Sequence, residues 1–73
     1  MEKVIHDSRE IEKILMYEKL PPDSQDLWSC MIDPRDVKGW HPLNGVMGRG
    51  ATQNQAFADF FRRAMLDGHQ FKQ

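Results

Sequence analysis

Residues 48–68 carry the signals for both ends of one helix. Thr52 is a favourable N-cap, and Gln55 three residues later completes a capping box, in which each side chain accepts a hydrogen bond from a backbone N–H near the other. Gly68 is typical of the position just after a helix, because glycine enters the left-handed region without a Cβ clash. We therefore predict a helix between Thr52 and Gly68.

This predicted helix has one apolar face, whose members recur at helical spacing. They are Gln53, Ala56, Phe57, Phe60, Phe61 and Ala64. Asp59, Arg62 and Arg63 lie on its other sides. Three phenylalanine rings on one face need a covering surface, and a second layer of structure supplies it. A chain of 73 residues has room for one small core, so we treat residues 1–73 as a single domain.

Two segments before the helix have the pattern of strands. In residues 27–33, Trp28, Cys30 and Ile32 alternate with more polar neighbours, and the Asp-Pro pair at 33–34 ends the run. Asn44-Gly45 is typical of a two-residue hairpin turn. Residues 46–49 then have the pattern of a second strand that leads into the helix.

Residues 8–20 fit two structures. A helix is favoured by Asp7 and Glu10 as a capping box and by Pro21-Pro22 as a sharp stop. A strand is favoured by the short apolar run before that turn. We prefer the helix. Residues 1–7 are expected to be extended or frayed, and the tail at 69–73 either folds back through Phe71 or is loose.

These elements predict a small α+β domain. We expect an antiparallel sheet of two to three strands packed against a C-terminal amphipathic helix, with an N-terminal helix in addition. The residues expected in the core are Trp28, Cys30, Ile32, Val46, Ala56, Phe57, Phe60, Phe61 and Ala64.

The net charge of −1 is unevenly distributed. Residues 1–36 hold five Lys and Arg against nine Asp and Glu, a net charge of −4, whereas residues 37–73 hold five against two, a net charge of +3. Such asymmetry marks either an interaction face or a weak attraction between two parts of one domain. A nucleic-acid-binding domain normally carries a larger basic excess.

Cys30 is the single cysteine, so no disulfide can form within the chain. A lone cysteine is typical of a reducing compartment. The N-terminal residues lack the apolar run of a signal peptide, and no stretch reaches the roughly 18 apolar residues of a membrane span. We expect a cytoplasmic protein that does not bind membranes.

The sequence that opens the last helix resembles the N-terminal domain of HicB-type antitoxins. The matching residues are Gly50, Thr52, Ala56 and Ala64, with Trp28 and Cys30 on the preceding strand. The match is tight over residues 45–66, and a looser one begins at Ile14 if that segment is a strand. The resemblance implies a β-β-β-α unit similar to a reduced RNase H-like fold, with Gly50 in the tight turn and Ala56 where helix and sheet approach.

The chain also departs from the pattern of that family. Gln53, Asn54 and Gln55 occupy positions that are usually acidic, and the proline-leucine-proline-glycine turn before the third strand is missing. No DNA-binding module follows the helix, so autoregulation of an operon is not expected.

No set of residues predicts catalysis. Cys30 lies mid-strand beside Trp28 and Ile32, where a cysteine packs as an inert small hydrophobe. His41 lies in a loop without a neighbouring nucleophile or orienting group. We expect a protein that is not an enzyme.

Neither a metal nor another cofactor is expected. His6, Cys30, His41 and His69 are spaced singly, whereas zinc sites use paired ligands. Gly48-Arg49-Gly50 precedes a helix, but it lacks the third glycine of a dinucleotide-binding motif and the Gly-Lys of a P-loop. The glycines are expected to serve a turn or a bulge.

Binding to another macromolecule is the function that the residue types favour. The chain has two Trp and five Met, and with Arg these types are enriched at interface hot spots. Residues 37–44 form a loop that is hard to bury completely. Trp40 in this loop either anchors a partner or completes the core. The candidate partner-binding residues are Lys38, Trp40, His41, Leu43, Arg49, Arg62 and Arg63.

We therefore expect a small inhibitor or antitoxin-like module that occupies the surface of another protein or a ribonucleoprotein. One alternative is a phage-encoded inhibitor of host defence, of the anti-CRISPR type, that blocks a nucleic-acid site. Another alternative is a small nucleic-acid-binding protein in which Trp40 stacks on an unpaired base. A homodimer that pairs through the edge strand at residues 46–49 is a further option.

Overall fold

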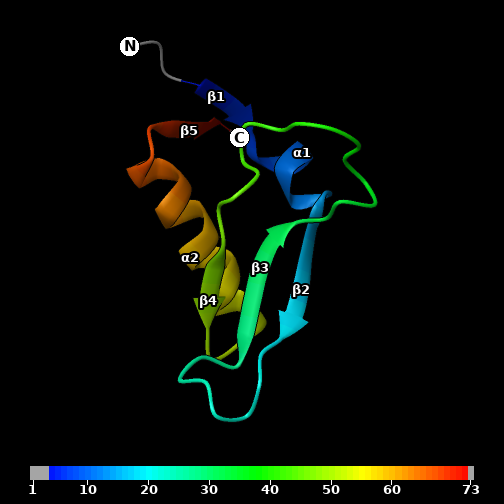
Figure 1. Cartoon of the computed structure of the whole chain (residues 1–73). Coiled ribbons are helices and arrows are strands. Elements are labelled where there is room, and N and C mark those ends of the chain that lie inside the picture. The colour runs from blue at the N-terminus through cyan, green and yellow to red at the C-terminus, as the bar shows by residue number, and fades with distance from the viewer. Residues whose placement is uncertain (1–3, 73) are drawn as a thin grey trace.

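The structure is a computed structural model that describes residues 4–72, and its main element is a three-stranded antiparallel sheet with one long helix against it (Figure 1). The strands β2 (Leu15–Lys19), β3 (Trp28–Ile32) and β4 (Gly48–Gly50) lie in that order, so β3 is central. The helix α2 (Gln53–Leu66) follows β4 and packs on β4 and β3. The predicted α+β fold is confirmed.

A second sheet joins the first and last strands that the structure describes. β1 (Val4–Asp7) and β5 (His69–Lys72) pair in parallel, with His6 opposite Phe71. Figure 1 shows this pair at the end of the molecule where α2 finishes. The predictions for residues 1–3 and 73 lie outside the described residues. Within them, the extended start is a strand, and the tail folds back as a strand instead of being loose.

Both ends of α2 follow the sequence prediction. The N–H of Gln55 donates to Oγ1 of Thr52 at 3.1 Å, and Oε1 of Gln55 accepts from the N–H of Ala51 at 2.9 Å. Gly68 has a φ of +98°, and its N–H donates to the C=O of Met65 at 3.1 Å. The local sequence therefore fixes the start and the end of the helix.

Residues 8–20 contain both structures that the sequence left open. The helix α1 (Ser8–Glu12) is only five residues long; Oδ1 of Asp7 accepts from the N–H of Arg9 at 2.9 Å, and Ile11 is buried. The chain then enters β2, so the preferred helix is confirmed for its first part only. Pairing with β3 satisfies the backbone of β2 and places Leu15 and Tyr17 against the core.

The hairpin predicted at Asn44-Gly45 was wrong. β3 and β4 are antiparallel neighbours, but residues 33–47 connect them. Gly45 has a φ of +92° in a turn where the N–H of Val46 donates to the C=O of Leu43 at 3.2 Å. Val46 is buried, so the chain first passes through the core and enters β4 only at Gly48.

The core lies between α2 and the sheet. Its buried apolar residues are Ile11, Cys30, Ile32, Leu43, Val46, Ala56, Phe60 and Ala64. Trp28, Phe57 and Phe61 were predicted there but are half-buried, because they lie at the margin of the contact between helix and sheet. Phe61 packs instead on Phe57 and on Phe71 of β5, with ring centroids 4.9 Å and 4.6 Å apart. The phenylalanine face of α2 thus joins the two sheets.

Gly48 lies where α2 crosses β4, and a Cβ there would overlap the C=O oxygen of Ala56 and the backbone nitrogen of Phe60. These are helix backbone atoms, which cannot move aside as a side chain can. We expect Gly48→Ala to lower the free energy of unfolding by about 3 kcal/mol in urea denaturation. Gly45→Ala is the matched control: nothing lies within 4 Å of its Cβ, so it adds only backbone strain of about 1–2 kcal/mol. Equal losses would contradict the prediction.

Candidate functional site

The loop between β3 and β4, residues 33–47, is fixed at its start by Asp33. Its buried carboxylate accepts from the N–H of Arg35 at 2.8 Å and from the guanidinium at 3.1 Å and 2.9 Å. These hydrogen bonds hold the pKa of Asp33 below its usual range. The C=O of Asp33 also accepts from the N–H of Val37 at 3.1 Å. The chain therefore leaves β3 in a defined turn.

The far end of the loop is fixed by His41 and Leu43. Nδ1 of His41 accepts from the N–H of Leu43 at 3.1 Å, and its C=O accepts from the N–H of Asn44 at 3.0 Å. The side chain of Leu43 is fully buried. The loop is therefore held by a polar turn at one end and by a core residue at the other.

Trp40 lies between these two anchors and is 81% exposed. The sequence left open whether this side chain completes the core or faces outward, and the structure places it outward. Lys38 beside it is also exposed, and His41 is half-buried. These three residues form the surface that we call the Trp40 patch.

Leu43 was predicted as a contact residue, and the structure corrects this. Its side chain has no exposed surface and belongs to the hydrophobic core. In so small a domain the sheet and α2 leave room for a residue from the long loop, and an isobutyl group gains more by burial than by exposure. Leu43 therefore positions the Trp40 patch from below and is not part of it.

The carboxylate of Asp59 binds the three remaining predicted residues, which are Arg49, Arg62 and Arg63. Asp59 accepts from the backbone N–H of Arg49 at 2.9 Å, from Arg62 at 2.6 Å and from Arg63 at 2.7 Å. Burial raises the pKa of Asp59, but the hydrogen bonds from the three arginines outweigh it and keep that pKa below its ordinary value. The carboxylate thus ties β4 to α2 and neutralises part of the basic charge.

The seven predicted residues therefore divide into two groups. Arg63, in the last turn of α2, lies beside residues 45–47 at the end of the loop. In Figure 1 the rest of the loop runs past β1 and β5, whereas β4 and the first turns of α2 lie toward the opposite end. Arg49 and Arg62 line a shallow hollow there with Gln55 and Asp26. Lys38, Trp40 and His41 belong to the loop, whereas Arg49, Arg62 and Arg63 belong to β4 and α2.

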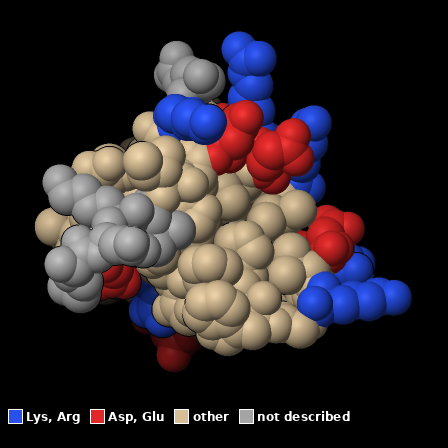
Figure 2. Space-filling model, turned by 90° about the horizontal axis from the view of Figure 1, so that it is seen from above, with Lys and Arg blue, Asp and Glu red and all other residues tan. Residues whose placement is uncertain are grey.

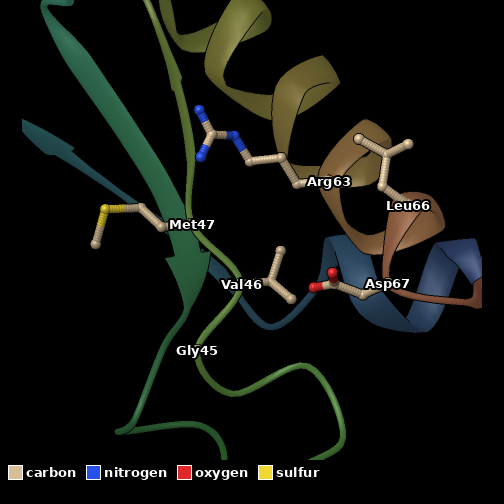
Figure 3. A pocket seen from close by; sticks show the side chains of 6 residues that line it. All are labelled: Gly45, Val46, Met47, Arg63, Leu66 and Asp67. Atoms are coloured by element: carbon tan, nitrogen blue, oxygen red, sulfur yellow. The ribbon is translucent and has the colours of Figure 1, made fainter.

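A second hollow, of about 260 Å³, lies where the chain enters β4 beside the end of α2 (Figure 3). Figure 3 shows Val46 and Asp67 pointing toward one another across it, while Met47 points to the far side of the strand. Leu66 at its edge is 73% exposed. Arg63 also lines this hollow, and its guanidinium is paired with Asp59.

One group of polar residues comes together only in the fold. His6, His41 and His69 were treated as single residues, but β1, β5 and the loop bring their rings together. No local pattern predicts this, because it depends on the parallel pairing of strands more than 60 residues apart. Within residues 4–72 no group of three or more His, Cys, Asp or Glu has an arrangement that would hold a metal ion.

Cys30 packs as the sequence predicted. It is fully buried in β3, and burial raises the pKa of its thiol to about 11. Tyr17 on β2 is its cross-strand neighbour, and burial followed by the charge and hydrogen bond of Cys30 raises the Tyr17 pKa to about 12. Both groups are neutral near pH 7, and a neutral, covered thiol is a poor nucleophile.

Comparisons with protein-family models, with curated proteins and with solved structures found no significant match. None of the helices within residues 4–72 has the length and apolar character needed to cross a bilayer.

We expect the charge of Asp59 to stabilise the contact between β4 and α2. We expect Asp59→Asn, which keeps the shape but removes the charge, to lower the free energy of unfolding at pH 7 by about 1 kcal/mol. Because the folded-state pKa lies below 3.8, the contribution of Asp59 is present above that pH and is lost as the pH falls through the folded value. Urea unfolding at pH 7 and pH 2.5 measures both effects.

The control for this variant is Asp67→Asn at the exposed end of the same helix. It should change the free energy of unfolding by no more than about 0.5 kcal/mol at either pH. A difference between Asp59→Asn and wild type that is as large at pH 2.5 as at pH 7 would show that charge is not what Asp59 supplies.

Proposed function

We propose that this chain is a non-enzymatic protein-binding module, a small inhibitor or antitoxin-like protein that acts by occupying a partner's surface. The observation that carries the proposal is Trp40, which is 81% exposed on a loop anchored on both sides. The lone, buried cysteine supports a reducing compartment, and we assign the protein to the cytoplasm.

An exposed indole on an anchored loop suits a contact residue for two reasons. Tryptophan contributes a large apolar area with only two side-chain torsions to immobilise, and it is among the residues most enriched at hot spots. The anchors at Asp33 and Leu43 also restrict the loop before binding, so less conformational entropy is lost on association. The free protein otherwise gains nothing from leaving this side chain in water.

The charges beside Trp40 define the kind of partner that fits. Lys38 is an exposed cation on the same loop as Trp40, whereas the Arg35 guanidinium is paired with the Asp33 carboxylate. We therefore infer a protein partner with an apolar pocket for the indole and an acidic group placed to meet Lys38. The resemblance to HicB-type antitoxins supports an antitoxin-like role, since β2, β3, β4 and α2 follow one another in the order that it implies.

Nucleic-acid binding is the alternative that an experiment has to separate from this. Trp40 can stack on a base, but Asp59 already engages Arg62 and Arg63, which reduces the charge available to phosphates. This pairing favours a protein partner over a nucleic acid.

Replacement of Trp40 tests the proposal directly. We expect Trp40→Ala to bind the partner at least about 30-fold more weakly than wild type, which is the loss typical of a hot spot. A titration with the purified partner measures this loss. Because the side chain is exposed, the free energy of unfolding should stay within about 0.5 kcal/mol of wild type. Leu66→Ala, at an equally exposed apolar site, is the control and should bind normally. Equal affinity of Trp40→Ala and wild type would reject the Trp40 patch as the interface.

Mobility shifts with single- and double-stranded oligonucleotides test the alternative. We expect no shift at 50 mM salt for wild type. A shift that disappears steeply as salt is raised would instead identify a nucleic-acid-binding protein. The variant Arg49→Ala should then reduce the salt dependence, because it removes a cation from the hollow beside α2.

A further inference from the structure

The three histidines of the chain, which we call the histidine cluster, meet at one place: His6 on β1, His41 in the loop and His69 on β5. Nε2 of His6 lies 3.0 Å from Nδ1 of His69. The His6 ring also stacks on His41, with centroids 6.1 Å apart, and on Phe71, at 5.4 Å. His6 therefore contacts both the last strand and the loop that carries Trp40.

Two hydrogen bonds of the histidine cluster require a ring nitrogen without a proton: the one from Leu43 to His41 and the one between His6 and His69. Nδ1 of His41 accepts from the N–H of Leu43, so it carries no proton. Between His6 and His69 one nitrogen donates and the other accepts, so the two facing nitrogens share one proton. One more proton at either place would set two N–H donors against each other and break the hydrogen bond.

Among residues 4–72, none of the charged groups that act on His6 compensates a positive charge on its ring. The charged groups that act on its ring are His69 on β5 and His41 in the loop. Strand alternation turns the side chains of Asp7 and Lys72, which pair in register, to the opposite face from His6. The other charged side chains of α1, of the loop near Trp40 and of the end of α2 are exposed to solvent: Arg9, Glu10, Glu12, Asp36, Lys38 and Asp67.

Figure 2 shows the end of the molecule that carries β1 and β5, viewed from above. The charged side chains gather along its edge, and the middle of the visible face consists of other residues.

The protonation of His6 is linked to the stability of the fold. Burial, followed by the charges of His69 and His41, lowers the pKa of His6 from its ordinary value of 6.5. The unfolded chain therefore takes up more protons than the folded one as the pH falls below 6.5. The fold is most stable above that pH and loses stability in the interval beneath it.

We propose that the histidine cluster is a pH switch, which holds the β1–β5 pair and the Trp40 loop together at neutral pH and releases both in mildly acidic solution. Release breaks the hydrogen bond between His41 and Leu43, which fixes the end of the loop. Trp40 then loses its fixed position and the partner is bound less tightly. This last step rests on the proposed function, whereas the release itself does not.

The wild-type protein alone tests the release. Between pH 7.5 and pH 5.5 we expect Tm to fall by roughly 5 °C. Amide hydrogen exchange, corrected for its intrinsic pH dependence, should become faster at Leu43 and in β1 and β5 but stay unchanged in β2 and β3. The carboxylates of Asp33 and Asp59 do not contribute in this range, because their folded pKa values lie below 3.8. Unchanged exchange in β1 and β5 overturns the proposal.

Two variants remove imidazole rings of the histidine cluster while keeping their contacts. His6→Phe preserves the stacking on Phe71, and His41→Asn offers a side-chain oxygen that can accept from the N–H two residues on. We expect the double variant to lose most of the difference in Tm between the two pH values, and Asp59→Asn to retain all of it. A double variant with the full wild-type difference overturns the proposal. If the double variant does not fold, the exchange measurement on wild type decides.

The coupling to binding is tested with the purified partner at both pH values. We expect wild type to bind at least about 10-fold more weakly at pH 5.5, and the double variant to bind equally at both. Equal wild-type affinity at both pH values overturns the coupling. If Trp40→Ala binds like wild type at pH 7.5, the proposed function fails, and the exchange and Tm measurements still decide whether the switch exists.

Discussion

Helix α2 can lie against β4 because Gly48 and Gly50 leave no side chain between the two backbones. Asp59 fixes the same contact from the side, since its carboxylate accepts from the backbone of β4 and from two arginines of α2. At this short separation the small side chains of Ala56 and Ala64 suffice to fill the space, and Phe60 is enclosed completely. The remaining core forms around this contact, so the position of every other element depends on it.

The small size of the core also explains why a large apolar side chain remains on the surface. A chain of 73 residues cannot cover all its large apolar side chains, and the long connection between β3 and β4 supplies some of the missing cover. Leu43 and Val46 are taken into the interior, whereas Trp40, only three residues before Leu43, remains outside. Because Leu43 and Val46 are buried in the core, the loop is anchored and the indole stays in one region of the surface.

The parts of the fold that depend on short-range chemistry could be predicted from the sequence. Thr52 and Gly68 gave the limits of α2, because capping involves residues within one turn of each other. The parallel pairing of β1 with β5 could not be predicted, since its register depends on contacts across nearly the whole chain. The split of residues 8–20 into α1 and β2 was missed for a similar reason: pairing with β3 overrides local helical preference.

The candidate site shows the same division. Trp40 is exposed because its loop has too few regular backbone partners to be buried. The sequence already indicated that residues 37–44 are hard to bury completely. The burial of Leu43 and the meeting of three histidines follow from tertiary packing, for which the chain offers no local signal. The sequence offered Arg49, Arg62 and Arg63 as candidates, but only the fold shows that Asp59 gathers them on β4 and α2.

The pairing of β1 with β5 has a consequence for synthesis on the ribosome. β1 precedes β5, its hydrogen-bonding neighbour, by more than 60 residues, so β1 cannot pair with it until residues 69–72 have left the exit tunnel. The sheet of β2, β3 and β4 can form earlier, together with α2, because all its members are complete by residue 66. The β1–β5 pair therefore requires residues that are synthesised after every member of the three-stranded sheet and α2.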